Sequence, residues 1–148
     1  MQDRDFGVTL ALGYQVMVRE LHAELARHGL TGLGSSYGYI LRTVEAGPLN
    51  QRQLAERLDV SDQAIGKTVS EMVRRKFLKR RVDPDDARAR QLVLGPQGEA
   101  TLRHAKQFHA KFEAKLAADL GGDVAATRRV LAHIIARGDG ADAQLRLV

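Results

Sequence analysis

Apolar residues recur at helical spacing in the first part of the chain. They fall close to one face, with charged residues on the other, at Leu10, Val18, Leu21 and Leu25. This pattern predicts a helix over residues 6–28, with Gly29 as its cap. A second helix is predicted to begin near Ser35 and to end before Gly47-Pro48, because these two residue types terminate helices.

Two sharper start signals follow. Asn50 is a good N-cap, and Gln53 three residues later completes a capping box. Ser61 supplies a second N-cap just beyond the end of the first short helix. The pattern predicts helices over residues 50–58 and 61–76. Two short capped helices with so brief a connection are typical of a helix-turn-helix.

The periodicity changes after Phe77. Residues 78–82 and 91–94 are rich in strand formers, and the turn-forming cluster at 83–87 separates them, which predicts a hairpin. Long apolar-periodic stretches then predict helices over residues 96–120 and 123–137. The expected fold is mainly α with a small β-hairpin wing (α+β): a winged helix-turn-helix with flanking dimerisation helices.

Composition supports one compact protein with a polyanionic partner. The 148 residues suit a single winged-helix protein over 1–148, divided into a DNA-binding region at 35–95 and a helical dimerisation region at 6–30 and 96–137. The net charge is +5; residues 50–94 hold eleven basic and seven acidic residues, which leaves +4 of that excess there. The positive charge is therefore concentrated where phosphate contact is expected.

Several other classes of protein are disfavoured. The chain has no cysteine, which removes disulfides and thiolate zinc sites. His104 and His109 are five residues apart and fall about 140° apart on a helix, so they do not predict a metal site. Neither a phosphate-binding glycine loop nor a nucleophile elbow is present, so we expect no enzyme and no cofactor. Without a signal peptide or a membrane-length apolar run, we expect a cytoplasmic, soluble protein.

At this point the sequence resembles a known family. The segment 54–58, the pair Val60-Ser61 and the wing 83–90, in which Asp86 and Arg88 are the most specific residues, are similar to the MarR family of bacterial regulators. The resemblance covers residues 6–137. It implies a triangular homodimer whose first and last helices intertwine, a recognition helix in the major groove and a wing in the minor groove. It also implies release of DNA when a small, often phenolic, anion binds between the two regions.

The predicted recognition helix carries the candidate base-reading residues. Gln63 can bond bidentately to adenine, and Lys67 can reach guanine or phosphate. Ser61 and the free N–H groups at the helix start can hold a phosphate. Ala64 and Thr68 share the same exposed face. The alternative is that these are ordinary solvated residues.

The wing carries the second set. Arg88 lies beside the hairpin tip, where an arginine can enter a narrow minor groove. Asp86 is expected to orient Arg88 or to brace the wing by a charge-assisted hydrogen bond. Phosphate contacts are predicted for Arg80, Arg81 and Arg90. Nearby, Arg74 and Arg75 also fit charges that favour the end of a helix dipole.

Polar aromatic residues are candidates for an effector site between the first, second and fifth helices: Tyr14, His22, Tyr37 and Tyr39. Packing in the core or at a dimer interface is the alternative, and the sequence favours it for these residues.

We therefore predict a sequence-specific DNA-binding transcriptional regulator, a homodimeric repressor of a pseudo-palindromic operator in double-stranded DNA, released by a small phenolic or anionic effector. The alternative is a winged-helix interaction module or a non-specific DNA-binding protein without effector response.

Overall fold

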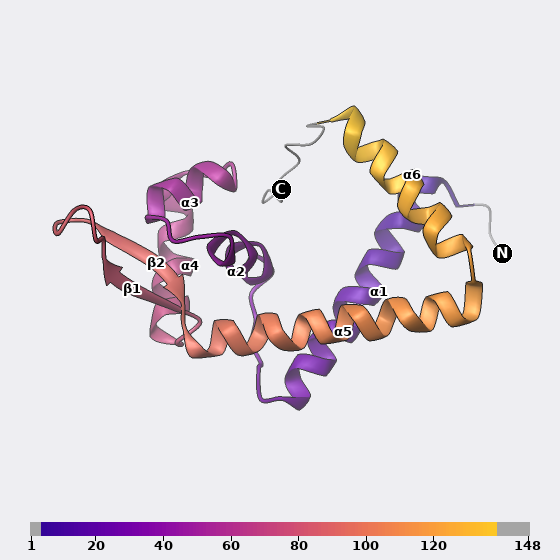
Figure 1. The fold of residues 1–148 in the computed structure, drawn as a ribbon, viewed down its shortest axis with the longest axis horizontal. Helices are drawn as coiled ribbons and strands as arrows, with labels where there is room; N and C mark the ends of the chain where they lie inside the picture. Colours follow the sequence, from indigo (N-terminus) through magenta and orange to yellow (C-terminus); the bar gives the residue numbers. More distant parts are fainter. Residues whose placement is uncertain (1–3, 139–148) are drawn as a thin grey trace.

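A computed structural model describes residues 4–138 of the chain. Within that range the chain forms six helices and one antiparallel pair of strands (Figure 1). The elements are α1 (Phe6–Arg27), α2 (Tyr37–Glu45), α3 (Gln51–Arg57), α4 (Asp62–Arg74), β1 (Leu78–Val82), β2 (Arg90–Leu94), α5 (Pro96–Leu120) and α6 (Asp123–Arg137). The predicted fold class is confirmed, with every expected element present and its bounds within two residues of those expected.

The helix-turn-helix is formed by α3 and α4, and local hydrogen bonds explain both helix starts. The Asn50 carboxamide oxygen accepts from the Gln53 N–H at 2.8 Å, and the Gln53 side chain accepts from the Asn50 N–H at 2.9 Å, so the predicted capping box is present. Ser61 Oγ accepts from the Ala64 N–H at 3.0 Å at the start of α4. Asp59, with φ of 57°, makes the tight turn between the two helices.

The wing is the hairpin of β1 and β2. Its strands pair from Leu78 opposite Leu94 to Val82 opposite Arg90. The Leu92 N–H also donates to the Leu49 carbonyl at 2.7 Å, which ties the segment before α3 to the inner edge of the hairpin. This bond anchors the hairpin to the segment before the helix-turn-helix. It therefore fixes the direction of the wing relative to α3 and α4.

One hydrophobic core holds the winged region together. Side chains from α2, α3, α4, both strands and the first turns of α5 meet in it, and Ile40, Leu41, Leu54, Leu58 and Val69 are fully buried. The turn from α4 into β1 runs through Lys76, whose φ of 64° is a left-handed conformation that usually favours glycine.

The helices outside the winged region are much less buried. Helix α5 runs from the base of the wing to the turn before α6, and α1 crosses it midway (Figure 1). Helix α6 has no buried residue within the part that the structure describes. None of the helices in residues 4–138 combines the length and the apolarity needed to cross a membrane.

Candidate nucleic-acid interface

The recognition helix α4 is held by one apolar face and presents the other to solvent. Its buried side chains are Ile65, Val69 and Met72. Gln63, Ala64 and Lys67 are exposed, and Thr68 is half-buried beside them. The structure therefore brings the four predicted α4 residues onto one accessible surface, where long polar side chains can reach a groove.

Helix α4 is also fixed at its N-terminus. The Gln51 side-chain amide donates to Asp62 Oδ1 at 2.7 Å, which links the first turn of α3 to the first turn of α4. Ser61 Oγ is occupied as an acceptor by the helix N–H, but its own hydroxyl proton can still be donated. Ser61 is thus placed to donate to a phosphate oxygen at the positive end of the helix.

The predicted arginines of the wing fall into two groups. Arg81 donates to Gln91 Oε1 from Nε and Nη2 at 3.2 and 3.1 Å, across the hairpin. Arg90 Nη1 donates to the carbonyls of Ala87 and Ala89 at 3.2 and 3.1 Å. Both arginines therefore stabilise the wing itself, and any phosphate contact would have to be shared with or exchanged for these bonds.

Arg80 and Arg88 form the second group. Both are exposed, and neither guanidinium has a hydrogen-bond partner among residues 4–138. Their donors are therefore available to a partner outside the chain. Arg88 lies in the hairpin loop and Arg80 in the middle of β1, so the two cations lie at different positions along the wing.

Carboxylates shape the loop of the wing. Asp83 Oδ1 accepts from the Asp85 N–H at 2.8 Å, and Asp86 Oδ1 accepts from the Arg88 N–H at 2.9 Å. The Gln91 amide donates to Asp83 Oδ2 at 3.0 Å. Of the two roles expected for Asp86, the structure shows bracing of the backbone; its carboxylate meets the amide of Arg88 rather than the guanidinium.

A separate cavity of about 250 Å³ lies between α1, α2 and α5. Its wall includes all four predicted effector residues: Tyr14, His22, Tyr37 and Tyr39. The hydroxyls of Tyr14 and Tyr39 are 3.2 Å apart, and this hydrogen bond is the main reason that the pKa of Tyr14 lies above its ordinary value. Tyr37 is also a buried core residue, so this side chain both lines the cavity and packs in the core.

Two basic groups complete this wall. Arg42 of α2 and His109 of α5 both face the cavity. Burial, followed by the nearby Arg42 charge, lowers the pKa of His109 below its ordinary value. His109 therefore favours its neutral form, which can donate or accept a hydrogen bond, and Arg42 brings the positive charge. Aromatic surface, phenolic hydroxyls and one cation suit a small aromatic or anionic molecule.

Comparison with known proteins fits this geometry. The family model described as MarR family matches residues 28–89, which contain the loop after α1, helix α2, the helix-turn-helix, strand β1 and the loop of the wing. Over these residues the chain is therefore similar to the MarR family. Members of the family are transcription regulators rather than enzymes, as we expected from the sequence. No protein of curated function matches the chain.

Solved MarR-type structures share the fold across nearly the whole chain. The transcriptional repressor CouR, solved with a 23-mer DNA duplex, is 24% identical, with 90% of this chain and 91% of that chain covered and a TM-score of 0.64. RV1404 from Mycobacterium tuberculosis is 18% identical, with 94% and 98% covered and a TM-score of 0.76. Escherichia coli MarR in its reduced form is 19% identical, with 91% and 98% covered and a TM-score of 0.67.

The histidines of this chain form no metal centre in the described part of the molecule, where no three metal-ligating side chains gather. Instead the rings of His28 and His104 stack, with centroids 3.7 Å apart and planes 15° apart. His104 Nδ1 is buried without a hydrogen-bond partner within residues 4–138. The stack joins the end of α1 to α5, which is a packing role that spacing alone did not indicate.

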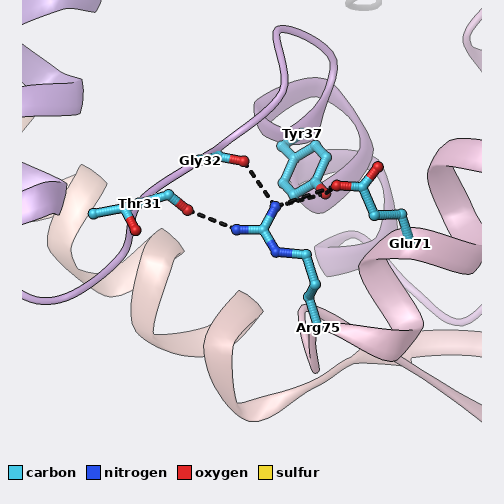
Figure 2. A network of polar contacts seen from close by, with 5 residues as sticks. All are labelled: Thr31, Gly32, Tyr37, Glu71 and Arg75. Carbon is cyan, nitrogen blue, oxygen red and sulfur yellow. Dashed lines mark hydrogen bonds and ion pairs between the residues drawn. The ribbon is translucent and has the colours of Figure 1, made fainter.

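Sequence reasoning missed the most connected side chain of the MarR-type region. Arg75, which we considered only as a charge at the end of a helix, caps α4 and turns its guanidinium onto the loop between α1 and α2 (Figure 2). Two of its partners are backbone carbonyls more than forty residues away in sequence. No local pattern signals such a contact, because backbone carbonyls are present at every position.

Proposed function

We propose that this chain is a homodimeric repressor that binds a pseudo-palindromic operator in double-stranded DNA and releases it when a small phenolic or anionic molecule enters the cavity. The base-reading residues are Gln63 and Lys67 on α4. The positioning contacts come from Ser61, Arg80 and Arg88, with Ala64 and Thr68 on the same surface, and with Arg81, Asp86 and Arg90 maintaining the wing.

One observation carries the DNA-binding part of this proposal. Gln63, Lys67 and Arg88 are exposed, and their side-chain donors have no partner within residues 4–138. The neighbouring arginines of the wing are already hydrogen-bonded inside the hairpin. Free polar groups on a rigid helix and at a braced hairpin tip are what groove recognition requires, since flexible donors would lose more entropy on binding.

The dimer is supported by apolar side chains without partners in a single chain. Helix α1 exposes Phe6, Val8, Leu10, Leu12, Tyr14 and Val16, and helix α6 exposes Val130, Ile134 and Ile135. Leu120 at the end of α5 is 55% exposed in the same part of the molecule. Large apolar side chains exposed in this number on two helices favour a partner that covers them. A second copy would cover it and place two recognition helices about one turn of DNA apart.

The effector is supported by the position of the cavity. Its walls come from α1 and α5 outside the winged region and from α2 inside it. A molecule bound there would contact both parts at once and so can bind one relative arrangement better than another. Arg42 favours an anion, and the tyrosine hydroxyls favour a ring with polar substituents.

Fluorescence-anisotropy titration tests this function directly. The protein is titrated into labelled DNA from upstream of its own gene and into a shuffled duplex, at two salt concentrations. We expect preference for a dyad-symmetric site by about a thousandfold or more, retained at the higher salt. Equal, salt-labile binding to both duplexes, and to every fragment in a selection from random DNA, would instead indicate a winged-helix module without base readout.

A further inference from the structure

The guanidinium of Arg75 forms a network that joins the recognition helix to the cavity wall (Figure 2). Nη2 donates to the Thr31 carbonyl at 2.6 Å, and Nη1 donates to the Gly32 carbonyl at 2.7 Å. Nη1 also lies 3.0 Å from the Tyr37 hydroxyl and 3.4 Å from Glu71 Oε1. One side chain at the end of α4 therefore contacts the α1–α2 loop, helix α2 and α4 itself.

The loop fits this guanidinium closely. Gly32 has φ of 63°, a left-handed conformation, and a β-carbon there would lie 3.3 Å from Arg75 Nη2. The Tyr37 ring centroid lies 5.5 Å from Arg75 Cζ, and the Phe77 centroid 5.0 Å, which adds cation–π contacts. The planar fork of arginine matches all these partners at once, and a lysine ammonium would not.

The other side of the network is the cavity. Tyr37 lines it, as do Leu33 and Gly34 immediately after the two bonded carbonyls. The Tyr37 hydroxyl donates to Glu71 Oε1 of α4 at 2.8 Å. This hydrogen bond is the largest reason that the pKa of Glu71 lies below its ordinary value, so the carboxylate stays charged beside Arg75. A displaced Tyr37 or loop would therefore pull directly on α4.

We propose that Arg75 is the positioning residue that transmits the state of the cavity to the recognition helix, with Tyr37 and Glu71 as its relay. This inference rests on the proposed effector response of the same cavity. We call the contacts of the Arg75 guanidinium with Thr31, Gly32, Tyr37 and Glu71 the clasp. When the clasp is closed, filling the cavity moves the α1–α2 loop and α4 together. With the clasp opened, α4 keeps its place in the core, because Ile65, Val69 and Met72 remain buried, but it no longer follows the loop.

The test needs no identified effector. Gly38 lines the cavity on α2, and a β-carbon there would meet nothing within 4 Å, so Gly38→Leu adds a permanent apolar side chain at the cavity wall without a clash at its β-carbon. The chain has no cysteine, so Ser70→Cys on the exposed side of α4 accepts a single trifluoromethyl tag. The fluorine NMR resonance of this tag then reports the surroundings of α4 in the absence of DNA.

We expect Gly38→Leu to shift the resonance in the parent protein and in Arg74→Lys. The neighbouring Arg74 is the matched control, since its side chain has no hydrogen bond within the described chain. In Arg75→Lys and in Tyr37→Phe most of that shift should be lost. In DNA titrations Gly38→Leu should weaken binding about tenfold in the parent and less than about threefold in Arg75→Lys.

The outcomes separate the two proposals. An equal fluorine shift in all backgrounds, or no shift in any, overturns the clasp. A protein that binds no specific DNA, but loses its fluorine shift in Arg75→Lys, refutes the proposed function and leaves the clasp standing. A merely structural role for Arg75 would lower thermal stability without changing the response to Gly38→Leu. If Arg75→Lys fails to fold, Tyr37→Phe decides the matter by the same comparison.

Discussion

The carbonyl oxygen of Phe77 lies 2.2 Å from the point that a β-carbon on Gly98 would occupy. Leu41 Cδ2 lies 3.0 Å from the same point. The first turn of α5 therefore packs directly on the backbone that leads from α4 into the wing, where the Gln97 N–H donates to the Lys76 carbonyl and the Gly95 N–H donates to the Phe77 carbonyl. This contact fixes the direction of the long helix relative to the wing.

Gly98→Ala should accordingly destabilise the protein. The clashing atom is a backbone oxygen that cannot rotate away, so we expect a loss of about 1 to 3 kcal/mol in the free energy of unfolding. Urea denaturation followed by circular dichroism measures it. Gly38→Ala is the matched control, because Gly38 is also helical but its β-carbon has open space, and a neutral or slightly stabilising effect is expected there. Equal effects at both positions would show that crowding at Gly98 is relieved cheaply.

Arg88→Ala should weaken binding to the preferred DNA by roughly 1 to 3 kcal/mol and reduce preference at the positions that the wing reads. Its guanidinium is exposed and unpartnered within residues 4–138, whereas that of Arg81 is engaged by Gln91. Arg81→Ala serves as the comparison and should have a smaller effect. Anisotropy titration against the preferred duplex and single-base variants measures both. An Arg88→Ala protein with unchanged affinity would show that the wing tip does not enter the groove.

Arg80→Ala should act differently, because Arg80 lies in the middle of β1, away from the hairpin loop, and is proposed to contact phosphate rather than bases. We expect binding to all sequences to weaken alike, and the slope of log affinity against log salt to fall in magnitude by about one. Titrations at four or five salt concentrations give the slope. A change in sequence preference without a change in slope would assign Arg80 to base readout instead.

The winged region was readable from sequence because its signals are local. Asn50 and Gln53 form the capping box that their spacing indicates, and Ser61 caps α4 as expected. Hairpin turn residues and strand formers likewise act within a few positions of one another. The wing also shows where this reasoning ends: Arg81 and Arg90 look equivalent to Arg80 in sequence, but cross-strand and loop geometry commits them to the hairpin.

Long-range contacts were out of reach for the same physical reason. The clasp of Arg75 uses carbonyls of Thr31 and Gly32, and the stack of His28 on His104 joins helices far apart in the chain. Neither depends on a spacing. The cavity was anticipated only through a family resemblance, and the sequence did not indicate that Arg42 and His109 would share its wall.

The stacked histidines predict that stability falls in mild acid. Burial, then the charges of His28 and Arg103, lowers the pKa of His104 below its ordinary value. The unfolded chain takes up a proton near pH 6.5, and the folded chain resists it until lower pH. Stability should therefore decline as the pH falls from about 6.5 toward the lowered pKa, and His104 should have no such effect above about pH 7.5.

Thermal melts at fixed protein concentration, between pH 5 and 8, check this dependence. In His104→Gln the melting temperature should fall less between pH 6.5 and 5 than in the parent, because the residue that resists protonation is gone. His133→Gln, which changes an exposed ring on α6, is the control and should keep the parent's fall in melting temperature. If the melting temperature falls equally with acid in all three proteins, the acid sensitivity lies outside the stack of His28 and His104. His109, whose pKa is lowered as well, is then a candidate.

Ile134→Glu should break the proposed dimer. Ile134 is 44% exposed on α6, with Val130 one turn away at 47%, and a second copy must cover both. Burying a new carboxylate without a partner there costs several kcal/mol, so the dimer should dissociate at concentrations at least about a hundredfold higher. Sedimentation velocity measures the change, and Arg129→Glu, which places a carboxylate off the apolar face and changes the net charge by two units rather than one, is the control. Weakened operator binding in Ile134→Glu alone would link dimerisation to DNA recognition, whereas a dimer that survives this substitution must be formed by another surface.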